Sequence, residues 1–188
     1  MPRGIGRNGG AGARAVPTER RGRRNGGCPV GQDYPVLRQT VLDCVDARGL
    51  AEFYRQLLGY AYRSGDEPPE RGKPDPQAQD WLVLLDRDGT SRLAFQPVTE
   101  LPAVTWPGLP VPQQLHLDLT VPARADLDAQ HERALALGAR LLLDQSADPE
   151  EPLRVYADPA GHPFCIFVAG QTRAPAGRKG LAPGRAQR

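Results

Sequence analysis

The feature that most constrains the fold is a pattern that occurs twice along the chain. Each copy has a β-rich run, an amphipathic helical segment that stops at a glycine, and then three further strand-like runs. The first copy spans residues 36–98 and the second spans residues 113–169. Self-similarity of this kind predicts one α+β domain made of two tandem βαβββ modules. A proline-rich connection, residues 99–112, joins them.

The expected elements follow from periodicity and from turn residues. Helices are predicted at 48–58 and 124–137, which end at Gly59 and Gly138. Residues 64–80 contain four prolines and are expected to form a loop. The strands are predicted at 36–46, 60–63, 81–86, 92–98, 113–121, 139–144, 153–157 and 163–168.

The segment 113–121 is the most informative of these strands. Its apolar residues alternate with polar ones, so one face packs on the helices while the other carries Gln114, His116, Asp118 and Thr120. The first strand alternates less cleanly, with Gln39, Val41 and Asp43 on one face. We therefore expect a curved, cup-shaped mixed sheet, with the helices outside and a partly polar surface inside.

Composition limits the folded part to residues 35–170. Residues 1–34 and 171–188 are rich in glycine and arginine and poor in large apolar side chains, so both are expected to be disordered tails. Between them lie 12 basic and 20 acidic residues, a net charge of −8. A folded part this acidic argues against a specific nucleic-acid partner.

The sequence also bears on cellular location. No run of 18 apolar residues is present, and no apolar stretch follows the basic N-terminus, so neither a membrane span nor a secretory signal is expected. Cys28, Cys44 and Cys165 are an odd number without close spacing, which favours a reducing compartment. The excess of arginine over lysine, together with abundant Ala, Pro and Gly, indicates a GC-rich bacterial genome. The expected location is the cytoplasm.

Several short motifs carry a resemblance to a known superfamily. They are Leu-Asp-Cys-Val-Asp before the first helix (42–46), Phe53-Tyr54 and Leu58-Gly59 within and after it, His-Leu-Asp-Leu (116–119), Leu-Gly-Ala (137–139) and Asp-Pro-Ala-Gly-His-Pro-Phe (158–164). Over residues 36–169 the chain resembles the vicinal oxygen chelate superfamily of glyoxalases, bleomycin-resistance proteins and extradiol dioxygenases. The resemblance implies the cup-shaped fold. It leaves the function open, because the group includes isomerases, lyases, dioxygenases and non-enzymatic drug-binding proteins.

The same resemblance implies where a metal would bind. Members that use a divalent ion hold it with four side chains from the first and last strands of each module. The matching positions are Gln39, His116, Cys165 and Gln96, with a register shift to Ala94 as the alternative to Gln96. The position of Cys165 most often carries Glu in that superfamily. Without a carboxylate this set suits a hard cation poorly. We therefore expect no bound metal, with a zinc-like ion as the alternative.

Other residues are candidates for ligand binding or catalysis. His116 and Asp118 share a strand face and could act as an acid–base pair, although Asp118 could equally be a solvated rim residue. Four aromatic residues on or beside the cup strands could wall a pocket with Gln39 and Gln96, the alternative being ordinary core packing. These aromatic residues are Trp81, Phe95, Trp106 and Tyr156. Trp106 lies in the connection and could serve as a lid or a dimer contact.

These observations leave three hypotheses about function. The first is a protein that binds or sequesters a small organic molecule, aromatic ligands included, without the usual metal site. The second is a lyase, isomerase or dioxygenase that uses a metal or the His116–Asp118 pair. The third is a non-catalytic interaction module. A homodimer is compatible with all three.

Overall fold

The computed structural model describes residues 36–108 and 110–169, so the two expected disordered tails lie outside the described residues. Within this part, no helix is long and apolar enough to cross a lipid bilayer. The first module contains β1 (Thr40–Cys44), α1 (Ala47–Leu58), β2 (Ala61–Tyr62), a 3₁₀ turn η1 (Gln77–Gln79), β3 (Leu82–Leu85) and β4 (Ser91–Pro97). The second contains β5 (Leu117–Val121), α2 (Arg124–Ala136), β6 (Arg140–Gln145), β7 (Leu153–Ala157) and β8 (Pro163–Val168).

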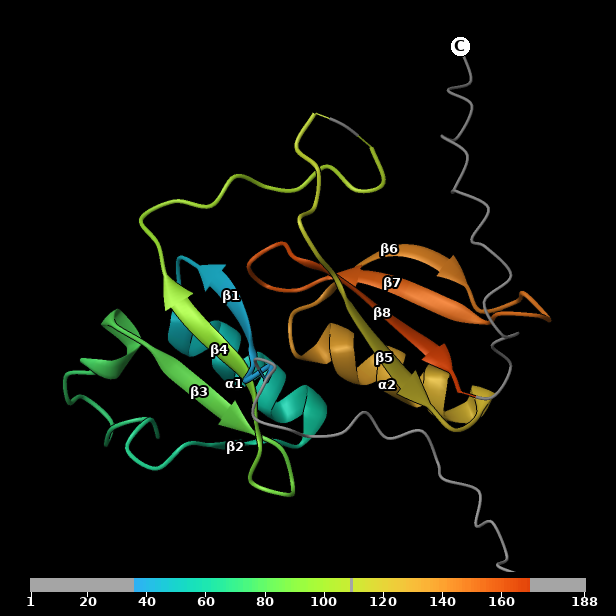
Figure 1. Cartoon of the computed structure of the whole chain (residues 1–188). Coiled ribbons are helices and arrows are strands. Elements are labelled where there is room, and N and C mark those ends of the chain that lie inside the picture. The colour runs from blue at the N-terminus through green and yellow to red at the C-terminus, as the bar shows by residue number, and fades with distance from the viewer. Residues whose placement is uncertain (1–35, 109, 170–188) are drawn as a thin grey trace, which may run out of the picture. The chain divides into compact units, whose positions relative to one another are not determined.

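Each module forms its own four-stranded sheet, as Figure 1 shows. The strand order is β1-β4-β3-β2 in the first sheet and β5-β8-β7-β6 in the second. In both sheets the first and last strands of the module pair in parallel, and the other pairs are antiparallel. The tandem βαβββ architecture predicted from the sequence is confirmed, with the mixed strands divided between two sheets.

Local signals set the bounds of α1. The Asp46 carboxylate accepts a hydrogen bond from the Gly49 amide at 2.9 Å, which caps the first turn. Gly59 ends the helix with φ of 67°, a conformation that favours glycine. Between these ends, the apolar stripe that includes Leu50, Phe53 and Tyr54 is buried against the first sheet.

The helix α2 depends less on its own apolar residues, since only Leu127 and Ala134 are buried along it. A buried arginine provides much of its attachment. Arg154 on β7 donates hydrogen bonds to the Leu127 carbonyl and to the carboxylates of Asp128 and Asp144. These contacts fix α2 and the β6–β7 hairpin to each other, because all the partners converge on a single guanidinium group.

One hydrophobic core joins the two modules. Phe164 of β8 has its ring centroid 5.9 Å from Phe53 and 6.3 Å from Tyr54, both on α1, and it stacks on Tyr156 of β7 at 5.2 Å. Tyr54 also stacks on Phe95 of β4 at 6.0 Å. Aromatic rings from both sheets thus pack around one helix.

This core corrects the expected placement of two aromatic residues. Phe95 and Tyr156 are fully buried in the cluster between the sheets and the helices, not on the opposite faces where a ligand cup was expected. The reason is that β4 and β7 are buried on both faces. Their sequences therefore do not alternate between apolar and polar residues as β5 does, and the pattern cannot show which face a side chain lies on.

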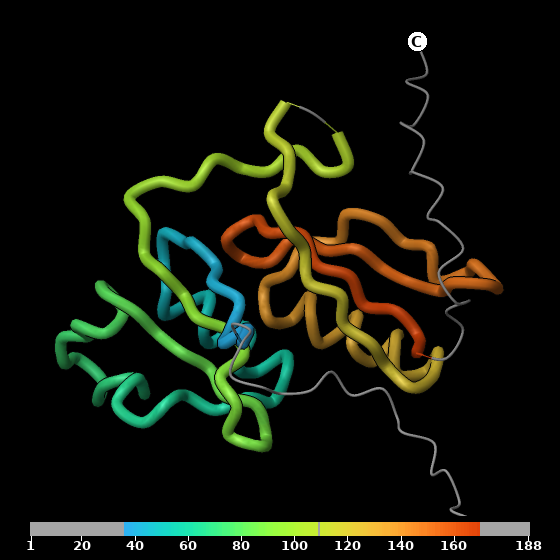
Figure 2. The backbone as a smooth tube through the Cα atoms, viewed as in Figure 1, coloured from blue at the N-terminus to red at the C-terminus, as the bar shows by residue number. Residues whose placement is uncertain are grey.

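The proline-rich connection runs from the end of β4 to the start of β5, as the trace in Figure 2 shows. It is held partly by its own hydrogen bonds. The Thr105 amide donates to the Val111 carbonyl at 2.8 Å, and the Val111 amide donates to the Thr105 hydroxyl at 2.9 Å. These bonds close a loop in the connection, and Trp106 lies half-buried within that loop.

Candidate functional site

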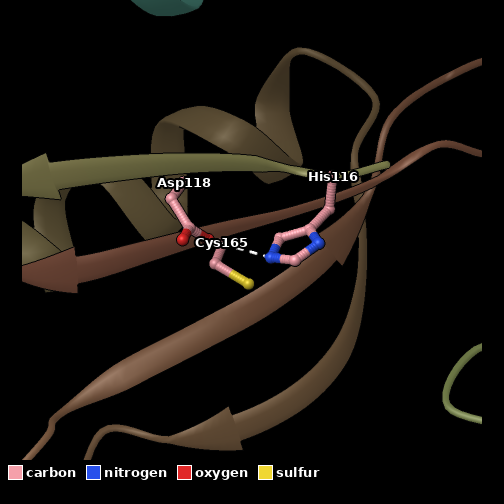
Figure 3. A group of neighbouring side chains, drawn as sticks. All are labelled: His116, Asp118 and Cys165. Atoms are coloured by element: carbon pink, nitrogen blue, oxygen red, sulfur yellow. Dashed lines mark ion pairs between the residues drawn. The ribbon is translucent and has the colours of Figure 1, made fainter. Parts of the chain in front are cut away.

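A cluster of three side chains lies on the face of the second sheet that points away from its helix, here called the open face. Asp118 on β5 is directly opposite Cys165 on β8, and His116 lies two residues before Asp118 on the same face. Figure 3 shows the three side chains pointing toward one another. The His116 Nε2 atom is 3.2 Å from Asp118 Oδ1, and one potential ligand atom from each residue lies within 4.8 Å of the others.

Gln113, in the segment just before β5, orients the imidazole of this cluster. The side-chain amide nitrogen of Gln113 lies 3.3 Å from His116 Nδ1. In that arrangement the amide donates to Nδ1, so the neutral imidazole carries its proton on Nε2 and donates to Asp118. The Gln113 Oε1 atom is buried, and no partner for it lies within the described part of the chain. Turning the amide over would place this oxygen as the acceptor for Nδ1 and leave the Nε2 lone pair available.

A cavity of about 400 Å³ lies between the connection and the second sheet; we call it the Trp106 cavity. Its walls come from the connection and from the open face of β6, β7 and β8. They comprise Val104, Thr105, Trp106, Gly108, Arg140, Leu142, Ala157, Gly161 and Pro163. Pro163 and its cross-strand partner Ala157 belong to the same open face as Cys165, whereas His116, Asp118 and Cys165 themselves are not among the lining residues.

The first sheet contributes less than the sequence suggested. Gln39 lies just before β1, and its side-chain oxygen accepts a hydrogen bond from the Ser91 hydroxyl. Val41 pairs with Ala94 in the first module as Asp118 pairs with Cys165 in the second, so the counterpart of Cys165 is Ala94.

The choice of Gln96 as a metal-ligand position is therefore corrected to the alternative register. The β3–β4 pairing contains a register shift at Leu84 and Leu85 that the β7–β8 pairing lacks, so counting residues along the sequence does not align the last strands, whereas their pairing with the first strands does. Gln96 is exposed and pairs with Asp43. Ala94 is buried and has no side-chain donor atom, so the matched position in the first module offers no ligand.

Of the aromatic residues named as pocket walls, Trp106 is the one that lines the cavity among the described residues. Trp81 is partly buried just before β3 and is not part of this wall. Phe95 and Tyr156 belong to the core, as described above. The Tyr156 hydroxyl lies 3.0 Å from His131 Nδ1 on α2.

Sequence reasoning missed a buried polar network around Asp158, in the turn between β7 and β8. Its carboxylate accepts hydrogen bonds from the Tyr54 hydroxyl at 2.9 Å and from the amides of Ala160 and His162, both at 2.9 Å. The His162 Nδ1 atom is 3.0 Å from the same carboxylate. The available signal was the pair Asp158 and His162, four residues apart across a glycine turn. Through Tyr54 the network ties this turn to α1.

Burial and the Asp158 charge govern the acid–base properties of this region. Burial lowers the pKa of His162, but the hydrogen bond and negative charge of Asp158 outweigh it, so that pKa is raised above its ordinary value. Burial, with a smaller contribution from Asp158, raises the pKa of the Cys44 thiol to about 12. Cys44 is therefore a protonated core residue at neutral pH and a poor nucleophile.

Comparison with known proteins agrees with this geometry. Residues 39–167 match the sequence family described as Glyoxalase-like domain. The chain belongs to this family. No curated protein matches it in sequence. The glyoxalase-like assignment covers both modules and the connection between them, so the whole fold described above is the family domain.

Solved structures show the same glyoxalase-like fold at low identity. A glyoxalase/bleomycin resistance protein/dioxygenase family enzyme from Burkholderia phytofirmans PsJN aligns with a TM-score of 0.50 and 16% identity, covering 71% of this chain and 98% of that one. The fosfomycin resistance protein FosX from Listeria monocytogenes aligns with a TM-score of 0.51 and 14% identity, covering 72% and 93% of the two chains. These likenesses establish the fold alone.

Proposed function

We propose that this glyoxalase-like protein binds a small organic molecule in the Trp106 cavity and does so without the four-ligand metal site of its metal-using relatives. The observation that carries the proposal is the cavity itself, whose wall combines the Trp106 indole ring with apolar side chains and Arg140. Its volume of about 400 Å³ falls within the size of small-molecule sites.

The first module supports the metal-independent part of the proposal. A four-ligand site needs donors from both modules, and the strand register puts Ala94 where the last strand of the first module would supply one. The side-chain oxygen of Gln39 already accepts a hydrogen bond from Ser91. His116 and Asp118 lie on the same open face as Arg140, outside the cavity wall, and would contact a ligand only where it extends along that face.

The test uses Trp106 as its own reporter. In a Trp81→Phe variant Trp106 is the only tryptophan, since the chain has two. After treatment with EDTA, this variant is titrated with a library of aromatic metabolites and antibiotics. We expect saturable quenching of Trp106 fluorescence and a rise in melting temperature for at least one compound.

The matched control is Trp106→Phe, which keeps Trp81 as the fluorophore and is expected to lose both the quenching and part of the affinity. If no compound in the library changes the fluorescence or the melting temperature of the Trp81→Phe protein, the proposed function is wrong.

A second candidate function is zinc-assisted chemistry at His116, Asp118 and Cys165. These three residue types are all zinc ligands, and three protein ligands with one open position are typical of catalytic zinc sites. The buried oxygen of Gln113 fits this use, because after rotation of its amide it would accept the Nδ1 proton of a His116 that binds through Nε2. A bound zinc ion would polarise a substrate oxygen or acidify a water molecule.

Cobalt substitution tests this second candidate directly. Metal-stripped protein titrated with Co²⁺ should develop a thiolate-to-cobalt absorption band in the near ultraviolet, and the band should disappear in Cys165→Ser. The control variant Cys28→Ser changes a cysteine far from the cluster in sequence and should keep the absorption band. A wild-type protein that shows no such band with Co²⁺ would exclude this candidate.

A further inference from the structure

We infer that the Trp106 cavity takes a planar aromatic anion, whose carboxylate pairs with Arg140 while its ring packs on Trp106. The inference deepens the proposed function and rests on it. Its starting point is the charge of the cavity wall. Arg140 is the one charged residue among the described residues that line the cavity, and no acidic side chain accompanies it there.

Arg140 is exposed and is one of several described arginines for which no ion pair with a carboxylate is found, but it is the one among them that lines the Trp106 cavity. Arg48, Arg63 and Arg92 each form an ion pair with an aspartate, at 2.7, 3.0 and 2.6 Å respectively. Among the described carboxylates none pairs with Arg140, although acidic residues outnumber basic ones in residues 35–170. Within residues 36–108 and 110–169, this cation of the cavity wall therefore has no carboxylate as its counter-ion.

Two sides of the cavity complement two parts of one ligand. Arg140 pairs with Ala157 across β6 and β7, so it belongs to the open face of the sheet, whereas Trp106 belongs to the connection. Leu142, Ala157 and Pro163 add apolar surface. A flat ring can pack on the indole and on this surface, while a carboxylate forms a two-pronged hydrogen-bonded pair with the guanidinium.

The size of the cavity limits the ligand. At about 400 Å³ it lies near the lower end of the range for ligand sites, which suits a compound of one or two rings. A neutral analogue of the same shape would fill the same space but would leave Arg140 without a counter-charge. The preference for the anion over its neutral isostere is therefore the measurable signature of this inference.

The experiment compares benzoate with benzamide, which have nearly the same shape. Both are titrated into the full-length Trp81→Phe protein, with Trp106 fluorescence as the readout. We expect benzoate to bind more tightly than benzamide by up to about fivefold, the range for an ion pair at an exposed arginine. Arg140→Gln should abolish that preference without weakening benzamide, and raised salt should weaken benzoate alone. Arg87→Gln removes another arginine that lies outside the cavity wall and should leave the preference intact.

The failures of the two proposals can be told apart. Equal affinity for benzoate and benzamide, or a preference that survives in Arg140→Gln, would overturn the anion inference while leaving cavity binding in place. The inference is also wrong if neutral library compounds bind and benzoate does not. If no library compound binds either, the proposed function fails as well. Urea unfolding of Arg140→Gln verifies that this variant is folded.

Discussion

Replacing Asp158 by alanine is expected to lower the free energy of unfolding by about 3–5 kcal/mol. The Asp158 side chain is completely buried and accepts hydrogen bonds from the Tyr54 hydroxyl and from two backbone amides, with the His162 imidazole beside it. Alanine would leave all of these donors buried without a partner. Gly161 and Pro163 of the same turn line the Trp106 cavity, so ligand affinity should fall together with stability.

Urea unfolding followed by circular dichroism measures this effect. Tyr54→Phe removes the hydroxyl that donates to the buried Asp158 carboxylate and should cost about 2 kcal/mol, the range for a hydrogen bond to a charged group. The control is Asp80→Ala, at an exposed position, which should stay within about 0.5 kcal/mol of the wild type. A loss below about 1 kcal/mol in Asp158→Ala would show that the network does not hold the turn.

The same network predicts how stability depends on pH. The folded-state pKa of His162 is raised above its ordinary value of 6.5, so the protonated imidazole is stabilised in the folded protein. This contribution is fully present below about pH 6.5 and is lost as pH rises through the raised pKa. Between pH 6 and pH 8.5 the free energy of unfolding should therefore decrease, and the decrease should be smaller in His162→Gln. An identical pH profile in the two proteins would contradict this account.

The strand with clear alternation was the one whose residues could be placed from sequence. In residues 113–121 a polar residue follows each apolar one, which put His116 and Asp118 on one face, and the structure brings their side chains to 3.2 Å. The pairing of β5 with its neighbour β8 could not be predicted from the local pattern in the same way. Cys165 joins them because β8 pairs in parallel with β5, a long-range contact that the resemblance suggested and local pattern alone does not specify.

Strands buried on both faces hide which way their side chains point. Leu82, Val83 and Leu84 of β3 are all buried, and the same holds for Val155, Tyr156 and Ala157 of β7. Apolar residues on both faces satisfy the hydrophobic effect equally well, so composition cannot distinguish a pocket wall from the core. The cavity depends instead on how the connection lies against the second sheet. The hydrogen bonds within the connection and its packing determine that position.

Phe164→Ala is expected to cost about 3–5 kcal/mol, comparable to the loss of Asp158. The Phe164 ring is fully buried and touches the rings of Phe53 and Tyr54 from the first module and Tyr156 from the second. Removing it leaves a cavity where the two modules share their core, which neighbouring rings cannot fill without leaving their own contacts.

Phe167→Ala provides the matched control for this prediction. Phe167 lies on the same strand but is only partly buried and is not part of the shared core, so its loss should cost less than half as much. Urea unfolding of both variants, followed separately by circular dichroism and by tryptophan fluorescence, gives the comparison. Equal losses in the two variants would mean that β8 is stabilised alike on both faces. A larger loss for Phe164→Ala, with both probes changing together, is expected if one core makes the two modules unfold as one unit.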